Sequence, residues 1–147
     1  MIDIDFPTLH GIGFKQQFVS QLSAASPQQR LARVTSVQRD ILTLDDGREA
    51  FPARSARFDS SGQPDVGDWV VATHSLGDWW IDSTLEAFTR LARRTPSGRQ
   101  VLASNVDTAL LLMGLDNDFN PRRMERYIAI VRACGVEPVM VLTKPDI

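Results

Sequence analysis

The sequence has one cysteine, Cys134, among its 147 residues, and only two histidines, His10 and His74. A single cysteine can form no internal disulfide. The histidines are isolated from each other and from any acid or cysteine at metal-ligand or catalytic spacing, so we expect them to be solvated or hydrogen-bonded structural residues. The sequence therefore predicts no zinc cluster within these residues, and one cysteine is compatible with a reducing cytoplasm.

Long apolar runs and a strong charge imbalance are also missing. No stretch approaches the roughly eighteen consecutive apolar residues of a membrane-spanning helix. The first residues, MIDIDFPTLHG, carry acids where a secretory signal would carry Lys or Arg. The formal charge of −2 does not indicate a basic nucleic-acid binder overall, while 43% hydrophobic residues suffice for a packed core. We predict a cytoplasmic chain with no membrane partner.

The hydrophobic pattern predicts an arm followed by a β-rich block. In the arm, residues 1–29, Phe14, Phe18 and Leu22 fall at i, i+4 and i+8, a helical stripe too short to be stable unless it docks on the next domain. Residues 30–97 contain about five short strand patterns and no long helical period. These strand patterns are ARVTSVQ, DILTLDD, REAFPAR, VGDWVVATHS and WWIDSTLEA. The fold class expected here is an all-β barrel of the OB type rather than a sandwich.

Residues 98–147 have an α/β pattern. VDTALLLMGL and PVMVLT are nearly continuous apolar runs, typical of parallel strands covered on both faces. Between them, Asn120 can cap a helix, Pro121 suits its first position, and Gly135 can close it in a left-handed conformation. The expected apolar face of this helix comprises Met124, Tyr127, Ile128 and Val131. The three elements predict one βαβ unit with a right-handed crossover.

The second strand of this unit ends in a turn, Thr143, Lys144, Pro145 and Asp146, that fits the [NT]KxD pattern of guanine recognition. The Asp146 carboxylate can accept hydrogen bonds from N1–H and the exocyclic amine of guanine, whereas the edge of adenine presents the opposite pattern. Lys144 can lay its aliphatic stem along the base, and the Thr143 hydroxyl can hold the turn. The alternative is an ordinary polar turn at a strand end. No GxxxxGK[ST] phosphate loop occurs in the sequence, and no DxxG magnesium motif occurs after residue 98.

The stretch from QVLASNVDTALLLMGLDNDFNPRRMERY to VMVLTKPDI resembles the opening of the GTPase domain in the bacterial ribosome small-subunit-dependent GTPases, a circularly permuted family. VGDWVVA, LARRT and the arm extend the similarity over nearly the whole chain. In that family the base-recognition motif precedes the phosphate loop, so the resemblance implies the N-terminal part of a permuted P-loop GTPase, inactive by itself. Thr143 stands where many GTPases have Asn, and Pro145 fills the variable position. The resemblance implies GTP and Mg²⁺ in the full-length protein, and zinc in a C-terminal domain absent here.

The same resemblance implies binding to the small ribosomal subunit and its rRNA during late assembly. The candidate RNA-binding residues are Arg90, Arg93, Arg94 and Arg99, which cluster with no acid among them. Arginine's planar guanidinium suits RNA phosphates, although a solvated linker is the alternative. Arg122, Arg123 and Arg126 are expected on a solvated helix face, with contact to RNA or another domain as the alternative. Of the adjacent Trp79 and Trp80, at most one can be a base-stacking platform, and Trp69 is expected in the barrel core.

Two functions from different classes remain: part of a GTP-hydrolysing assembly factor, or a stand-alone OB-fold RNA-binding module whose βαβ tail never meets a nucleotide. The sequence also predicts a sheet remnant with one crossover helix and an uncovered apolar face. That face should drive self-association or pack against the chain's own barrel.

Overall fold

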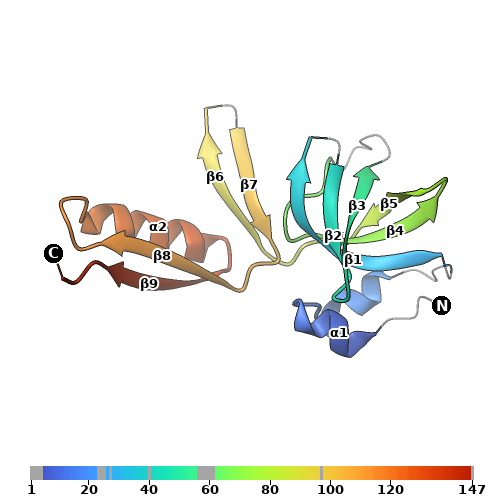
Figure 1. The fold of residues 1–147 in the computed structure, drawn as a ribbon. Helices are drawn as coiled ribbons and strands as arrows, with labels where there is room; N and C mark the ends of the chain where they lie inside the picture. Colours follow the sequence, from blue (N-terminus) through green and yellow to red (C-terminus); the bar gives the residue numbers. More distant parts are fainter. Residues whose placement is uncertain are drawn as a thin grey trace. The chain divides into compact units, whose positions relative to one another are not determined.

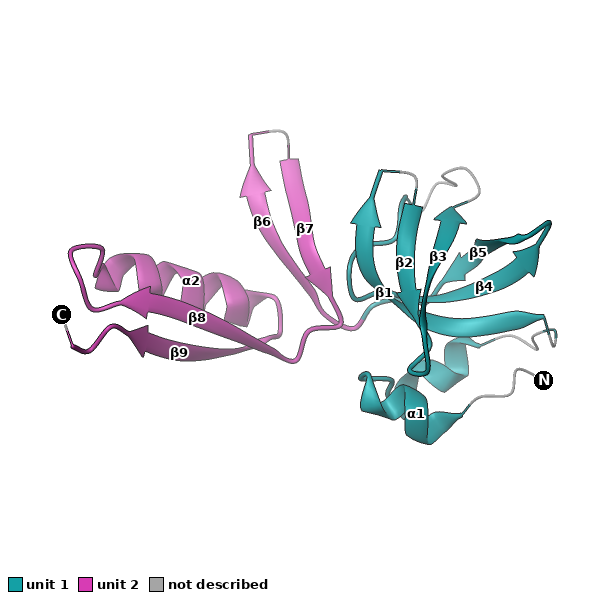
Figure 2. Cartoon of the chain, in the orientation of Figure 1, with its two compact units in different colours: residues 1–87 teal, residues 88–147 magenta. Residues whose placement is uncertain are grey.

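The computed structural model describes residues 5–22, 26, 28–39, 41–55, 62–96 and 98–146. The chain forms two compact units, Met1–Ala87 and Phe88–Ile147 (Figure 2). Among the helices of the described residues, none is long and apolar enough to span a membrane. The domain limits predicted at residues 29/30 and 97/98 stay a prediction.

A closed barrel of five strands, in the order β1-β2-β3-β5-β4, forms most of the first unit (Figure 1). The strands are β1 (Gln29–Gln38), β2 (Ile41–Asp45), β3 (Ala50–Ser55), β4 (Trp69–Ser75) and β5 (Asp78–Thr84). Neighbouring strands are antiparallel except β3 and β5, which are parallel. The barrel matches all five strand patterns of the sequence, and the predicted OB-type fold class is confirmed.

The barrel interior is filled by alternate residues of its strands, as the period of two in a β-strand requires. They are Ala32, Val34, Leu42, Leu44, Phe51, Ala53, Val70, Ala72 and Ile81. The β2–β3 turn contains Asp46 and Gly47, and Gly47 has a φ of 84°, where a side chain would be strained. A Cβ at Gly47 would also lie 2.9 Å from the Thr8 carbonyl oxygen, so this glycine lets the turn approach the arm.

The arm forms two short helices rather than one helical stripe. These are α1 (Phe6–Gly11), which the Asp5 side chain caps by accepting from Thr8 N, and the 3₁₀ helix η1 (Gln16–Gln21). Gly13 has a φ of 96° and separates them. The stripe expected from Phe14 to Leu22 falls on η1, which includes Phe18 but not the two end residues. The arm nevertheless packs on the barrel exterior, where Phe14, Phe18 and Trp69 are fully buried together. Trp69 is thus buried as expected, but between arm and barrel rather than inside the barrel.

The second unit contains a hairpin and a βαβ unit. The hairpin pairs β6 (Arg90–Thr95) with β7 (Gly98–Ser104), and neither strand was expected from the sequence. The βαβ unit consists of β8 (Thr108–Gly114), α2 (Pro121–Ala133) and β9 (Glu137–Thr143), with β8 and β9 parallel as predicted. Asn120 accepts from Arg123 N at 3.0 Å, and Gly135 has a φ of 73°, as expected for the two helix ends. Met124 and Val131 are buried, but Tyr127 is 43% exposed, which corrects part of the predicted apolar face.

Candidate functional site

The turn after β9 is joined to the end of β8. Leu115 N donates to the Thr143 carbonyl oxygen at 2.9 Å, and the Thr143 hydroxyl donates to the Met113 carbonyl oxygen at 3.4 Å. Thr143 therefore connects the two strand ends through backbone and side chain. The carboxyl ends of parallel strands are where ligands of open α/β sheets bind.

Lys144 has a left-handed backbone, with a φ of 58°, and its ammonium forms an ion pair with the Asp116 carboxylate. Asp116 also accepts from Asp118 N at 3.0 Å. The hydrogen bond from Lys144, followed by that from Asp118 N, holds the pKa of Asp116 below its ordinary value. The same bond to Asp116 raises the pKa of Lys144. Lys144 is therefore charged and held in place, although half of its side chain is exposed.

Pro145 and Asp146 follow Lys144 and are both exposed. An exposed carboxylate beyond the strand end can accept hydrogen bonds from a ligand without first breaking a buried contact. Guanine recognition by these residues stays a prediction. The sequence did not predict a role for Asp116. Its position just after the apolar run of β8 is the one feature of the sequence that could have indicated it.

The four candidate RNA-binding arginines all lie on the hairpin and are exposed. Arg90, Arg93 and Arg94 are on β6, and Arg99 on β7 lies directly opposite Arg94. Arg93 Nε donates to Gln100 Oε1 at 3.0 Å. Three of these arginines line a groove of about 820 Å³, together with Tyr127 and Ile130 of α2. Among the described residues that line it, none is acidic.

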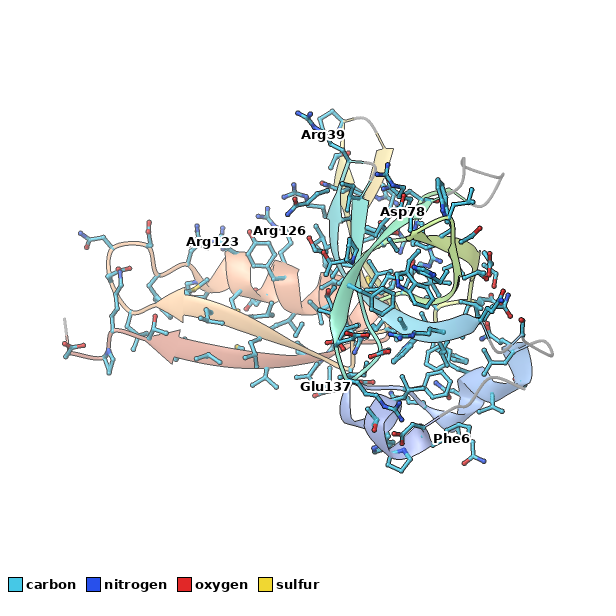
Figure 3. The ribbon with its side chains drawn as sticks, turned by 45° about the vertical axis from the view of Figure 1, so that its right-hand side comes forward. Phe6, Arg39, Asp78, Arg123, Arg126 and Glu137 are labelled. Atoms are coloured by element: carbon cyan, nitrogen blue, oxygen red, sulfur yellow. The ribbon has the colours of Figure 1, made fainter. Side chains whose placement is uncertain are left out.

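The arginines of α2 are arranged differently. Arg123 and Arg126 extend outward from the helix (Figure 3). Arg123 Nη2 donates to the Asp118 carbonyl oxygen at 2.8 Å, so it supports the loop before the helix. Arg126 and Arg122 are exposed, and the Arg126 guanidinium lies 5.7 Å from the Tyr127 ring centroid. A solvated helix face stays the prediction for these residues, with contact to RNA or another domain as the alternative.

A second cluster, on the barrel, surrounds Trp79. The Arg30 guanidinium lies 4.8 Å from its ring centroid, and the Phe51 and His74 rings lie at 5.0 and 5.1 Å. Arg30 also forms ion pairs with Asp46 at 3.1 Å and Glu49 at 2.7 Å. Two carboxylates on one guanidinium leave no local excess of positive charge, so this cluster is poorly suited to phosphate. Trp79 and Trp80 are both half-buried.

Comparisons with known proteins agree on one family. The family model described as "RsgA GTPase" matches residues 84–147. The chain is 37% identical to the "Small ribosomal subunit biogenesis GTPase RsgA" of Xanthomonas oryzae pv. oryzae (strain PXO99A), over 99% of this chain and 43% of the relative. It is 40% identical to the protein of the same description from Xanthomonas campestris pv. campestris (strain B100), over 84% of this chain and 36% of the relative.

Two solved structures share the fold. One is the crystal structure of YloQ, described as a circularly permuted GTPase, with a TM-score of 0.64 and 18% identity over 85% of this chain and 44% of that chain. The other is YjeQ from Thermotoga maritima, with a TM-score of 0.63 and 21% identity over 80% of this chain and 42% of that chain. The chain therefore spans less than half the length of these relatives.

Proposed function

The chain belongs to the RsgA family of circularly permuted GTPases, and from that premise we propose that it supplies the RNA-binding barrel and the guanine-recognition turn of a GTP-hydrolysing factor for late assembly of the small ribosomal subunit. The RsgA relatives are described as small ribosomal subunit biogenesis GTPases. Because the chain spans 43% of the first of them, the activity of a full-length protein is part of the proposal. Work on ribosomal subunits would take place in the cytoplasm.

The observation that carries this proposal is the position of the Thr143–Asp146 turn, beyond the carboxyl end of a parallel strand, with Asp146 exposed. In the proposed complex, Asp146 accepts from the guanine edge and the Lys144 stem covers the base. Among the described residues no group of three or more His, Cys, Asp or Glu could hold a metal, so we assign Mg²⁺ and Zn²⁺ to none of them. Calorimetric titration of the full-length protein with GTP and ATP tests the proposal. Selective binding of GTP supports it, and equal affinities contradict it.

The arginine hairpin is the proposed contact to rRNA. Like charges directly opposite each other in a strand pair destabilise it, so an anion bound between Arg94 and Arg99 would relieve their repulsion. The groove beside them adds the exposed Tyr127 ring, on which an unpaired base could stack. Phosphate and base contacts of this kind are typical of proteins that bind single-stranded RNA.

Replacing Arg94 and Arg99 together by Ala is expected to weaken binding to small-subunit rRNA and to reduce its salt dependence. Binding of the variant releases fewer counterions from the RNA, because two phosphate contacts are missing. The slope of log K against log salt should therefore fall in magnitude by about 1.4 to 1.8. Filter binding between about 50 and 200 mM salt measures the slope. The control replaces Arg48 and Arg54, which are already in ion pairs with Asp5 and Asp78. An unchanged slope in the hairpin variant contradicts the assignment.

We also propose that the 147-residue chain self-associates through its small sheet. Leu110 and Leu112 alternate along β8, so they lie on one face, and they are 62% and 65% exposed. Paired apolar side chains this exposed are typical of an association surface. Replacing both by Thr should lower the mean mass measured by sedimentation equilibrium, while Thr at Ile41 and Val66, exposed residues of the other unit, should not. A wild-type chain that stays monomeric at about 100 μM contradicts this proposal.

A further inference from the structure

The acid that holds Lys144 lies 28 residues before it in the sequence, in the loop that follows β8. The parallel register places Gly114 of β8 directly beside Thr143 of β9. Asp116 therefore follows one strand end and Lys144 the other, and their side chains meet across the two ends. The Asp116 side chain is only 20% exposed, so it lies against the protein.

Gly114 makes room for this carboxylate. A Cβ at Gly114 would lie 3.0 Å from Asp116 Oδ1 and 3.2 Å from both Cγ and Oδ2. These distances are shorter than ordinary carbon–oxygen contacts, so an alanine would displace the carboxylate by a few tenths of an ångström. The absence of a side chain at the strand end thus lets Asp116 fold back toward Lys144.

We infer that Asp116 is a positioning residue of the base-recognition turn, which holds the Lys144 ammonium so that the lysine stem is already arranged to cover a purine ring. This inference rests on the proposed guanine binding. The family's TKxD-type motif does not include this acid, because Asp116 reaches the turn through the fold and not through the sequence.

The physical reason is the freedom of the lysine side chain. Lysine has a flexible four-carbon stem, and ordering that stem on binding opposes association. In this chain the Lys144 backbone is fixed in the left-handed region and its ammonium is tied to Asp116 before any ligand arrives. A base that stacks along the stem then binds a side chain that is already ordered.

The ion pair can be tested in the 147-residue chain without a nucleotide. The carboxyl carbon of Asp116, followed by NMR through acid titration, should show a pKa below the ordinary value, because Lys144 favours the charged form. In a Lys144→Gln variant this pKa should rise, whereas Glu125→Gln, which removes an exposed charge from α2, should leave it unchanged. An Asp116 pKa that does not respond to Lys144→Gln overturns the inference.

The role in recognition requires the full-length protein. Asp116→Asn should weaken binding of GTP and of inosine triphosphate by the same factor, about two- to fivefold, because Lys144 covers the ring that both share. Asp146→Asn should weaken GTP more than inosine triphosphate, because inosine lacks the exocyclic amine that Asp146 binds. Gly114→Ala should act in the same direction as Asp116→Asn, and melting temperatures establish that the variants are folded.

The outcomes separate this inference from the proposed function. If Asp146→Asn changes the nucleotide preference and neither Asp116→Asn nor Gly114→Ala weakens binding, the turn recognises guanine but Asp116 does not position it. If none of the three variants changes binding, the proposed function itself fails. Equal losses for both nucleotides in the folded Asp116 and Gly114 variants support the inference.

Discussion

Replacing Asp146 by Asn in the full-length protein is expected to weaken GTP binding about 100-fold or more and to make xanthosine triphosphate the preferred nucleotide. The carboxylate is proposed to accept two hydrogen bonds from guanine, and a charge-assisted bond contributes about 1.5 to 3 kcal/mol. An amide cannot replace the carboxylate opposite the exocyclic amine, because its NH₂ group is a donor facing a donor. Xanthine has an oxygen at that position, which can accept the amide proton.

Calorimetric titration with GTP, ATP and xanthosine triphosphate measures this change. The control is Glu137→Gln, which removes an exposed charge at the opposite end of β9 and should leave all three affinities unaltered. The 147-residue chain alone should not hydrolyse GTP, because it contains no phosphate-loop motif. It should bind GTP at about millimolar affinity or weaker, because the loss of translational and rotational freedom offsets most of the free energy of two hydrogen bonds and one stacked lysine. Micromolar GTP binding by this chain, or unaltered preference in the Asn variant, would show that recognition runs through other residues.

Much of the fold follows from local patterns. The strands of the barrel alternate apolar and polar residues, and the βαβ unit combines two apolar runs with clear capping residues at Asn120 and Gly135. The β6–β7 hairpin lacks such a pattern, because LARRT contains three polar residues in a row. Its strands form because LARRT and RQVLAS pair with each other, which is a property of the pairing and not of either segment.

The candidate site also contains residues that the sequence predicts and residues that only the fold brings together. Thr143, Lys144 and Asp146 are contiguous, so their residue types and spacing carry a chemical prediction directly. Asp116 has no such signature, because its contact with Lys144 depends on the parallel register of β8 and β9. The groove beside Arg94 and Arg99 likewise requires an exposed tyrosine on α2, whereas helical periodicity placed Tyr127 on the buried face. An amphipathic pattern identifies the residues on the apolar face of a helix, but it does not show how many of them the neighbouring elements bury.

Replacing Phe14 by Ala is expected to lower the free energy of unfolding of the first unit by about 3 to 5 kcal/mol, the usual effect of removing a buried phenyl ring. Phe14 is 2% exposed and contacts Trp69 edge to face, with ring centroids 4.9 Å apart, and Phe18 at 5.4 Å. The arm also has polar attachments to the barrel, such as the ion pair of Arg48 with Asp5 at 2.8 Å. Its two helices have six residues each, however, and such short helices are not stable without packing. Loss of Phe14 should therefore loosen the arm and expose Trp69.

The matched control is Phe6→Ala, which removes the same ring from the same arm at a position that is 44% exposed, and should change the free energy of unfolding by less than about 1 kcal/mol. Tryptophan fluorescence during urea unfolding measures both variants. All three tryptophans, Trp69, Trp79 and Trp80, lie in the first unit, so the signal reports that unit even if the second unfolds separately. Because Trp69 lies under the arm, its emission should shift toward that of a solvated ring in the Phe14 variant before urea is added. Equal effects of the two variants would mean that the arm is not held by the cluster of Phe14, Phe18 and Trp69.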